Sequence, residues 1–147
     1  LRIMEVVRKN CPWDKSQTHL SLMQYLLEET YEVIESIEDG DDEHLKEELG
    51  DLLIQIIFHC ILASERKKFD IKDVINTISE KLTRRHPHVF GNLNVSGEEE
   101  VLHNWEKIKL SEGKTSALQG VPKNLPALLK ASRIQAKADL QAGEIAY

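Results

Sequence analysis

Apolar residues recur at intervals of three and four positions along most of this sequence, with polar residues between them. This period is that of an amphipathic helix, whereas no stretch of useful length shows the strict alternation typical of a half-buried strand. Turn-forming residues divide the pattern, among them Pro12, Gly40 and Pro87. The pattern therefore predicts an all-α chain, with helices at residues 1–10, 18–38, 41–64, 71–85, 96–111 and 125–141.

The two longest predicted helices, 18–38 and 41–64, are joined by a tight link at Gly40 and should therefore pack antiparallel. Residues 52–57 make the second half of helix 41–64 apolar over most of its circumference, which indicates burial on several sides. In a chain of 147 residues, the expected cover is a second subunit. We expect antiparallel helices in a four-helix-bundle-like core that is completed by dimerisation, in a homodimer or a higher homo-oligomer.

Short-range signals refine this outline. Ser96 and Glu99 have the spacing of a capping box at a helix N-terminus. Residues 10–14 and 87–95 are rich in turn-forming residues and are expected to be irregular. His59 lies on an apolar helix and is expected to be a hydrogen-bonded core histidine.

Composition narrows the class of protein. Charged residues make up 30% of the chain and the formal net charge is −6, which argues against generic nucleic-acid binding. No apolar run approaches membrane-spanning length and no signal-peptide pattern is visible, so no membrane partner is expected. Cys11 and Cys60 have neither a metal-binding nor a redox spacing. A reduced, disulfide-free, cytoplasmic protein is the expectation.

Acidic residues concentrate between Glu28 and Asp51, where twelve acidic side chains accompany one basic side chain. Glu29 and Glu32 share one helix face, and Glu48 and Asp51 share another. Four facing carboxylates repel one another unless a cation lies among them, and all-oxygen ligands favour Mg²⁺, with Mn²⁺ as a substitute. Glu28 is a candidate base for a water molecule or a further ligand. The alternative is that these carboxylates are solvated salt-bridge partners.

The motif Glu28-Glu29-x-x-Glu32, followed after fifteen residues by Glu48-x-x-Asp51, resembles the signature of the MazG-type all-α nucleoside triphosphate pyrophosphohydrolases. The similarity covers roughly residues 1–112 and extends to Cys11-Pro12-Trp13-Asp14, Gln17-Thr18-His19 and Arg84-Arg85-His86-Pro87-His88. It implies Mg²⁺-dependent hydrolysis of NTPs or dNTPs at the α–β bond, giving monophosphate and pyrophosphate, in nucleotide-pool house-cleaning. Residues 113–147 resemble the connector and entry helix of a second, absent domain.

The same resemblance assigns contacts with the triphosphate nucleotide to Lys81 and Arg85, and to Trp105 and Lys109. Each pair is four residues apart, so both members face the same way on a helix. Arginine can donate two parallel hydrogen bonds to a phosphate, lysine supplies a point charge and tryptophan offers a flat apolar face. Glu28, Lys81 and Arg85 are the expected catalytic residues, with the two cations neutralising charge on the departing pyrophosphate. The alternatives are ordinary solvation near a helix C-terminus for the cations and core packing for Trp105.

Two other functions stay open. The chain is alternatively a catalytically silent, nucleotide-binding or regulatory half of a two-domain MazG protein. It is alternatively a di-iron or di-manganese bundle, but such a site needs two Glu-x-x-His motifs on different helices. The sequence contains a single motif of this kind, at Glu100 and His103, which counts against that interpretation.

Overall fold

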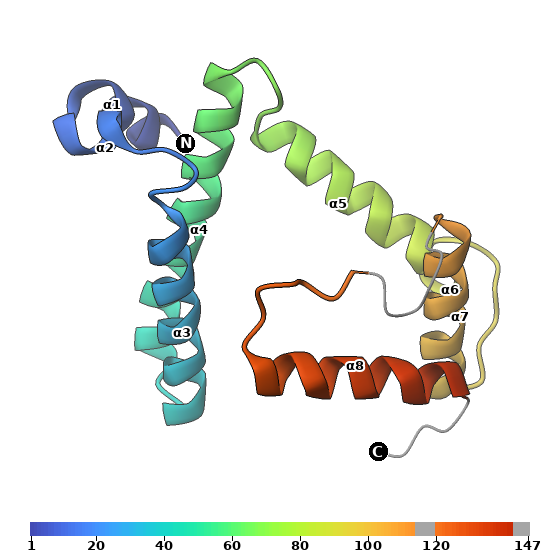
Figure 1. Cartoon of the computed structure of the whole chain (residues 1–147). Coiled ribbons are helices and arrows are strands. Elements are labelled where there is room, and N and C mark those ends of the chain that lie inside the picture. The colour runs from blue at the N-terminus through green and yellow to red at the C-terminus, as the bar shows by residue number, and fades with distance from the viewer. Residues whose placement is uncertain (114–119, 143–147) are drawn as a thin grey trace. The chain divides into compact units, whose positions relative to one another are not determined.

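The computed structural model describes residues 1–113 and 120–142, the side chains of 140–142 excepted, and each regular element in this part is an α-helix. The expected all-α class is confirmed. No helix among the described residues is long and apolar enough to cross a membrane. In chain order, the helices in Figure 1 are α1 (Arg2–Asn10), α2 (Pro12–Ser16), α3 (Met23–Asp39), α4 (Asp42–Glu65), α5 (Ile71–Arg85), α6 (Pro87–Phe90), α7 (Glu98–Ser111) and α8 (Ala127–Ala142).

The chain divides into two compact units, Leu1–Thr77 and Ile78–Tyr147. The division falls inside α5, so the first unit contains α1 to α4 and the beginning of α5. All of the expected carboxylate ligands belong to the first unit, and all of the expected phosphate-binding residues belong to the second.

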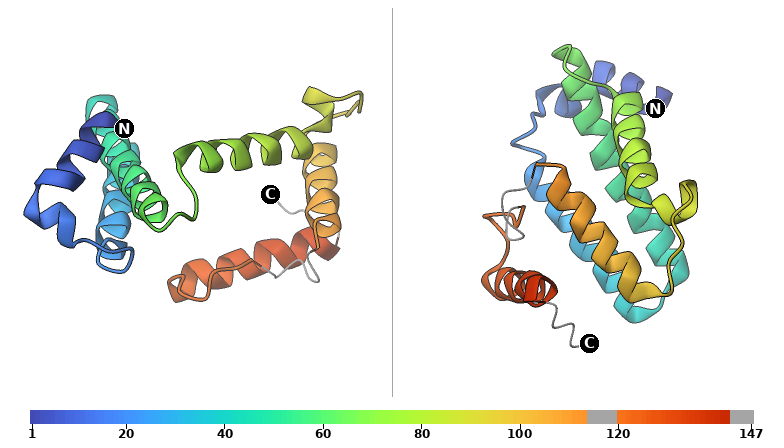
Figure 2. Two further views of the ribbon diagram at one scale, coloured as in Figure 1. Left: turned by 90° about the horizontal axis from the view of Figure 1, so that it is seen from above. Right: turned by 90° about the vertical axis from the view of Figure 1, so that its right-hand side faces the viewer.

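A hairpin of α3 and α4 forms the framework of the first unit. Gly40 ends α3 in the left-handed conformation, with φ at 69°. The N–H groups of Gly40 and Asp41 donate to the carbonyls of Ile37 and Ser36, at 3.3 and 3.2 Å, which is a Schellman cap. The Asp41 carboxylate then caps α4 by accepting the backbone N–H groups two and three residues further on, both at 3.1 Å. The two helices lie side by side and antiparallel, as the tight link predicts (Figures 1 and 2).

The buried core of the first unit is small. Leu22, just before α3, is 1% exposed and packs with Phe58 and Leu62 of α4. Met4 of α1 and Tyr25 of α3 pack against this cluster. The core therefore joins the N-terminal helices to the second half of α4.

Arg8 strengthens the same junction. Its Nε and Nη2 donate to the two carboxylate oxygens of Glu65, each at 2.8 Å. Its Nη1 donates to the backbone carbonyls of Asp14 and Gln17, the latter at 3.3 Å. The guanidinium also lies over the Phe58 ring, 5.8 Å from the centroid. The planar guanidinium carries five N–H donors and can therefore bind all of these partners. A lysine in its place would leave some of them without a donor.

Large apolar side chains remain exposed on both helices of the hairpin. On α3 they include Leu27, Tyr31 and Ile34, and on α4 they include Leu49 and Leu53. A second copy of the chain would cover such faces in a four-helix-bundle-like core. Dimerisation itself stays a prediction.

Two segments that were expected to be irregular contain short helices. α2 begins at Pro12 and α6 begins at Pro87. Proline terminates a helix that precedes it, but its fixed φ and missing N–H also suit the first turn of a new helix. The sequence-based prediction took only the first of these effects into account.

Two helix starts also differ from the prediction. α3 begins at Met23 and not at Thr18, because Thr18 and Ser21 hold each other in a turn. Each donates its backbone N–H to the other's hydroxyl, at 2.9 and 3.1 Å. Before α7, Ser96 bonds to Glu100 and not to Glu99, its partner in the predicted capping box. The Glu100 carboxylate accepts both the backbone N–H and the hydroxyl of Ser96, each at 2.8 Å.

His59 is half-buried, and its ring is nearly parallel to that of His19, with the ring centroids 5.0 Å apart. The two Nδ1 atoms are 2.7 Å apart, and Arg66 Nη2 is 2.6 Å from His19 Nε2. Because a guanidinium only donates, His19 accepts at Nε2 and donates from Nδ1 to His59 Nδ1. Burial, and then the neighbouring His19, lower the pKa of His59. Its Nε2 has no hydrogen-bond partner among the described residues, so the expectation of a fully satisfied core histidine is wrong at this atom.

Candidate active site

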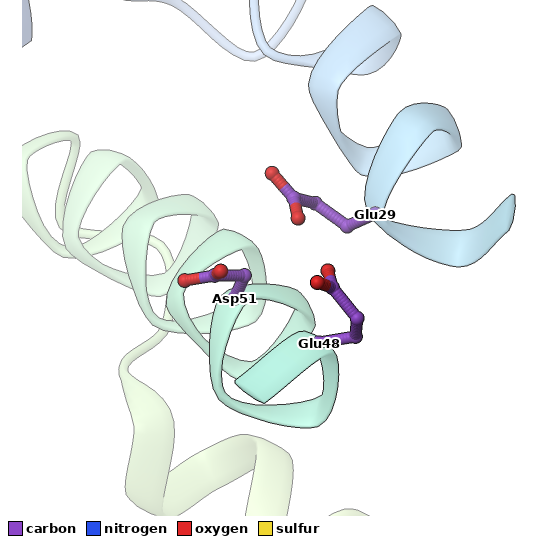
Figure 3. Close-up of side chains that lie close together, drawn as sticks. All are labelled: Glu29, Glu48 and Asp51. Carbon is purple, nitrogen blue, oxygen red and sulfur yellow. The ribbon is translucent and has the colours of Figure 1, made fainter. Parts of the chain in front are cut away.

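Three of the four predicted metal ligands converge in the first unit. Glu29 projects from α3 towards α4, where Glu48 and Asp51 stand one turn apart (Figure 3). One carboxylate oxygen of each residue lies within 4.8 Å of those of the other two. Glu29 and Glu48 are half-buried, whereas Asp51 is exposed. We call these three residues the carboxylate cluster.

The hairpin explains why these side chains meet. Glu29 lies eleven residues before Gly40 and Asp51 lies eleven residues after it. Glu32 and Glu48 are each eight residues from the same glycine. Two antiparallel helices have the same rise per residue, so positions equally far from the turn lie at the same level. The tight turn at Gly40 therefore sets the level of both acidic pairs.

Glu32, the fourth predicted ligand, lies beside the carboxylate cluster. Its negative charge is among those that raise the pKa of Glu29, but it is not one of the three residues whose oxygens gather within 4.8 Å. Glu28 is exposed on α3 and is also outside this group. The predicted roles of Glu28 and Glu32 stay predictions.

The electrostatics of the carboxylate cluster disfavour its charged state. Burial is the largest cause that raises the pKa of Glu29, and the negative charges of Asp51, Glu32 and Glu48 raise it further. A carboxylate surrounded in this way gains stability when a cation is placed among its neighbours. The donors are all carboxylate oxygens, which suit a hard divalent cation such as Mg²⁺ better than a soft one. The residues present therefore fit the predicted cofactor.

His44 was not among the predicted site residues. It lies one turn before Glu48 on α4, and its Nε2 is 3.0 Å from Glu48 Oε1. The Glu48 side chain is only 13% exposed, so this contact restricts the orientation of a largely shielded carboxylate. The spacing of four residues between His44 and Glu48 is visible in the sequence and was the signal available for finding it.

The predicted phosphate-binding residues lie on two helices of the second unit. Lys81 and Arg85 are on α5, and Trp105 and Lys109 are on α7. All four side chains are half-buried. The Trp105 ring meets the His86 ring edge to face, with the centroids 4.8 Å apart. Packing against His86 therefore accounts for part of the position of Trp105.

Two of the three predicted phosphate-binding cations are paired with carboxylates. Lys109 pairs with Glu106, one turn earlier on α7. Arg85 donates from Nη2 and Nε to the two oxygens of Glu112, at 2.5 and 3.3 Å. Arg84 donates from Nε to the same carboxylate at 2.8 Å. The sequence held no local signal for Arg84 or Glu112, because 28 positions separate them along the chain.

A sequence profile of the MazG nucleotide pyrophosphohydrolase domain matches residues 17–90. This chain belongs to that family. The matched residues include the carboxylate cluster, Lys81 and Arg85, whereas Trp105 and Lys109 lie beyond them. The family recognised from the acidic motif is confirmed.

Curated relatives of the MazG chain are longer than it is. It is 46% identical over 142 residues to the nucleoside triphosphate pyrophosphohydrolase of Escherichia coli K12, covering 92% of this chain and 54% of that protein. It is 48% identical over 141 residues to the nucleoside triphosphate pyrophosphohydrolase/pyrophosphatase MazG of Thermotoga maritima, with the same two coverages. It is also 53% identical over 128 residues to the uncharacterized protein YabN of Bacillus subtilis, covering 85% of this chain and 26% of that protein. The chain thus spans about half the length of the two named pyrophosphohydrolases.

A solved structure shares the fold. The crystal structure of a mazG-related protein from Thermotoga maritima superposes with a TM-score of 0.64 at 28% identity. The match covers 74% of this chain and 95% of that chain. The all-α architecture of this MazG chain therefore corresponds to nearly the whole of a known MazG-related protein.

Proposed function

We propose that this MazG chain hydrolyses nucleoside triphosphates, NTPs or dNTPs, between the α and β phosphates, releasing the monophosphate and pyrophosphate. The observation that carries the proposal is the convergence of Glu29, Glu48 and Asp51 from two helices. The names of the relatives from Escherichia coli and Thermotoga maritima support the same reaction class. The proposed role is nucleotide-pool house-cleaning.

The proposed cofactor is Mg²⁺, with Mn²⁺ as a substitute. Glu29, Glu48 and Asp51 would hold the ion, with Glu32 as a fourth ligand beside Glu29. When bound, such an ion supplies positive charge for the phosphate oxygens and lowers the pKa of a coordinated water. Glu28 is the proposed base for the attacking water or a further ligand, and its exposure leaves it accessible for either role.

The second unit supplies the proposed phosphate-binding groups. Lys81, Arg85 and Lys109 would neutralise the charge that builds on the departing pyrophosphate. Trp105 would present its ring face to the nucleotide. Arg85 and Lys109 pair with carboxylates here, which supports the proposal that they bind an anionic group of the substrate.

Two further proposals concern assembly and extent. A homodimer would cover the exposed apolar faces of α3 and α4. Residues 1–112 would form the MazG unit itself, and 113–147, of which 114–119 and 143–147 lie outside the described residues, would be a connector and C-terminal helix resembling the entry to a second domain.

Product analysis tests the reaction. The purified chain is incubated with Mg²⁺ and each NTP or dNTP in turn, with EDTA as the control, and the products are separated by ion-exchange chromatography. Monophosphate and pyrophosphate that form only with the metal would support the proposal. Diphosphate with orthophosphate would place the cleavage at another bond and contradict it. No turnover would indicate a silent, nucleotide-binding half of a two-domain protein.

A pair of variants tests the carboxylate cluster. Glu48→Gln keeps the size of the side chain but removes a negative charge, and should lower turnover about 100-fold or more while the helical circular dichroism is retained. Glu38→Gln is the matched control, because Glu38 is exposed on α3 and lies nine residues, or two and a half turns, from Glu29. Equal rates in the two variants would remove Glu48 from the site.

A further inference from the structure

Arg84 and Arg85, at the end of α5, both donate hydrogen bonds to the carboxylate of Glu112. Arg85 donates to both oxygens of Glu112, from Nη2 at 2.5 Å and from Nε at 3.3 Å. Arg84 adds a donation from Nε to Oε1 at 2.8 Å. Three N–H donors from two consecutive arginines therefore converge on one anionic group.

Geometry and helix electrostatics set this group apart from an ordinary surface ion pair, although Arg84 and Glu112 are exposed residues. The side chains of Arg85 and Glu112 are only 16% and 20% exposed, whereas that of Arg84 is 53% exposed. Glu112 is the C-cap residue of α7, where the helix dipole disfavours a negative charge. Its position is thus explained by the two arginines and not by its own helix. The matching cations stand at the C-terminal end of α5, where they are favoured.

A phosphate group offers the same recognition chemistry as this carboxylate. Two oxygens on one centre accept the parallel N–H donors of a guanidinium in either case. A pyrophosphate or triphosphate carries more charge than one carboxylate, so it competes well for the same donors. The exposed side of Arg84 gives an incoming anion access to the pair.

We propose that Arg84 and Arg85 form one anion site for the pyrophosphate portion of the substrate, and that Glu112 occupies it as an internal anion until the phosphates displace it. This inference rests on the proposed function for the identity of the anion, and it adds Arg84 and Glu112 to the residues that determine substrate binding. Without substrate, Glu112 holds the two neighbouring arginines in place. An anion with little charge does not compete well enough with Glu112 to displace it.

The exchange depends on a competing anion and not on protonation. The hydrogen bonds from Arg85 and then Arg84 lower the pKa of Glu112 to about 2. Glu112 therefore stays ionised throughout the neutral range, and changing the pH there does not release the arginines.

Titration calorimetry with inorganic pyrophosphate in EDTA tests the proposal on the full chain. Glu112→Gln removes the competing charge and should tighten pyrophosphate binding by about tenfold, the scale of a lost charge-assisted hydrogen bond. Arg84→Ala should weaken binding by a similar factor. Glu65→Gln is the matched control, because it breaks another two-pronged arginine–glutamate pair, with Arg8 in the first unit, and should leave the pyrophosphate affinity unchanged. An unchanged or weaker affinity in a folded Glu112→Gln variant would overturn the proposal.

A measurement on the unmodified chain covers the case in which Glu112→Gln does not fold. The Nε–H resonances of Arg84 and Arg85 should shift together as pyrophosphate is added, with one dissociation constant. Shifts confined to other residues would overturn the proposal. Neither readout requires turnover. Tighter binding in Glu112→Gln with no hydrolysis by the wild type would contradict the enzyme assignment alone, whereas normal hydrolysis with unchanged affinities would contradict this inference alone.

Discussion

Asp51→Asn should stabilise the metal-free chain and greatly reduce its response to Mg²⁺. The substitution keeps the shape of the side chain and removes one of three carboxylates that gather within 4.8 Å. Asp and Asn have similar helix propensities, so the change in charge dominates the effect on α4. The two effects have opposite signs, which separates a metal site from an ordinary acidic surface.

Coulomb's law gives the magnitude. Two unit charges 4.8 Å apart, the outer limit within the carboxylate cluster, repel by about 3.5 kcal/mol at an effective dielectric constant of 20 and by about 0.9 kcal/mol in water. Asp51 is exposed, so the smaller value applies, and it faces both Glu29 and Glu48. The expected gain in the free energy of unfolding is therefore about 1–2 kcal/mol without metal, decreasing as salt screens the charges.

Mg²⁺ should stabilise the wild type and have little effect on the variant. At ten times its dissociation constant, a ligand that binds only the folded state stabilises the wild type by about 1.4 kcal/mol. The variant lacks a ligand and should gain much less. Urea unfolding followed by circular dichroism, with EDTA and with Mg²⁺, gives all four free energies.

Glu38→Gln is again the control, since it removes the same unit of charge from an exposed position on α3. It should change the metal-free stability only slightly and keep the full response to Mg²⁺. If Asp51→Asn is no more stable than the wild type without metal and is still stabilised by Mg²⁺, the argument from charge repulsion is refuted.

Two other changes should alter stability for different reasons. Gly50→Ala should raise the free energy of unfolding by about 1 kcal/mol in urea, because a Cβ at this mid-helix position meets no atom within 4 Å; no gain would indicate a contact that the single chain does not contain. The pKa of His59 is lowered from its usual 6.5 by burial and then by His19, so the unfolded chain takes up a proton first as the pH falls. Stability from this group is complete above about pH 6.5 and is lost below it, and His59→Gln should flatten the profile between about pH 7 and pH 5. An equally steep loss in the variant would assign the pH dependence to other groups.

Local sequence signals were sufficient for the main elements of the fold. The period of the apolar residues placed the long helices, and α5 has the expected bounds, Ile71–Arg85. Gly40 predicted the tight link of the hairpin, because a left-handed C-cap is a property of a few adjacent residues. The approach of Glu29 and Asp51 in Figure 3 followed from that hairpin, since both lie eleven residues from Gly40.

The starts of several helices depended on competing local effects, and the pattern of apolar residues did not show which effect was stronger. Pro12 and Pro87 each begin a short helix as well as ending the preceding segment. The bonds between Thr18 and Ser21 delay the start of α3, although the apolar period alone favours helix there. In each case a side-chain or ring constraint outweighed a weak propensity.

By itself, the sequence determined the all-α class, the antiparallel hairpin and the residue types that gather at its acidic face. Only the tertiary structure decided that Glu29, Glu48 and Asp51 converge while Glu32 lies beside them, and that Glu112 binds Arg84 and Arg85. The physical reason is the distance along the chain over which each kind of interaction acts. Periodicity and caps depend on neighbours within one or two turns, whereas convergence depends on how each helix is rotated and which rotamer each side chain adopts when distant segments pack together.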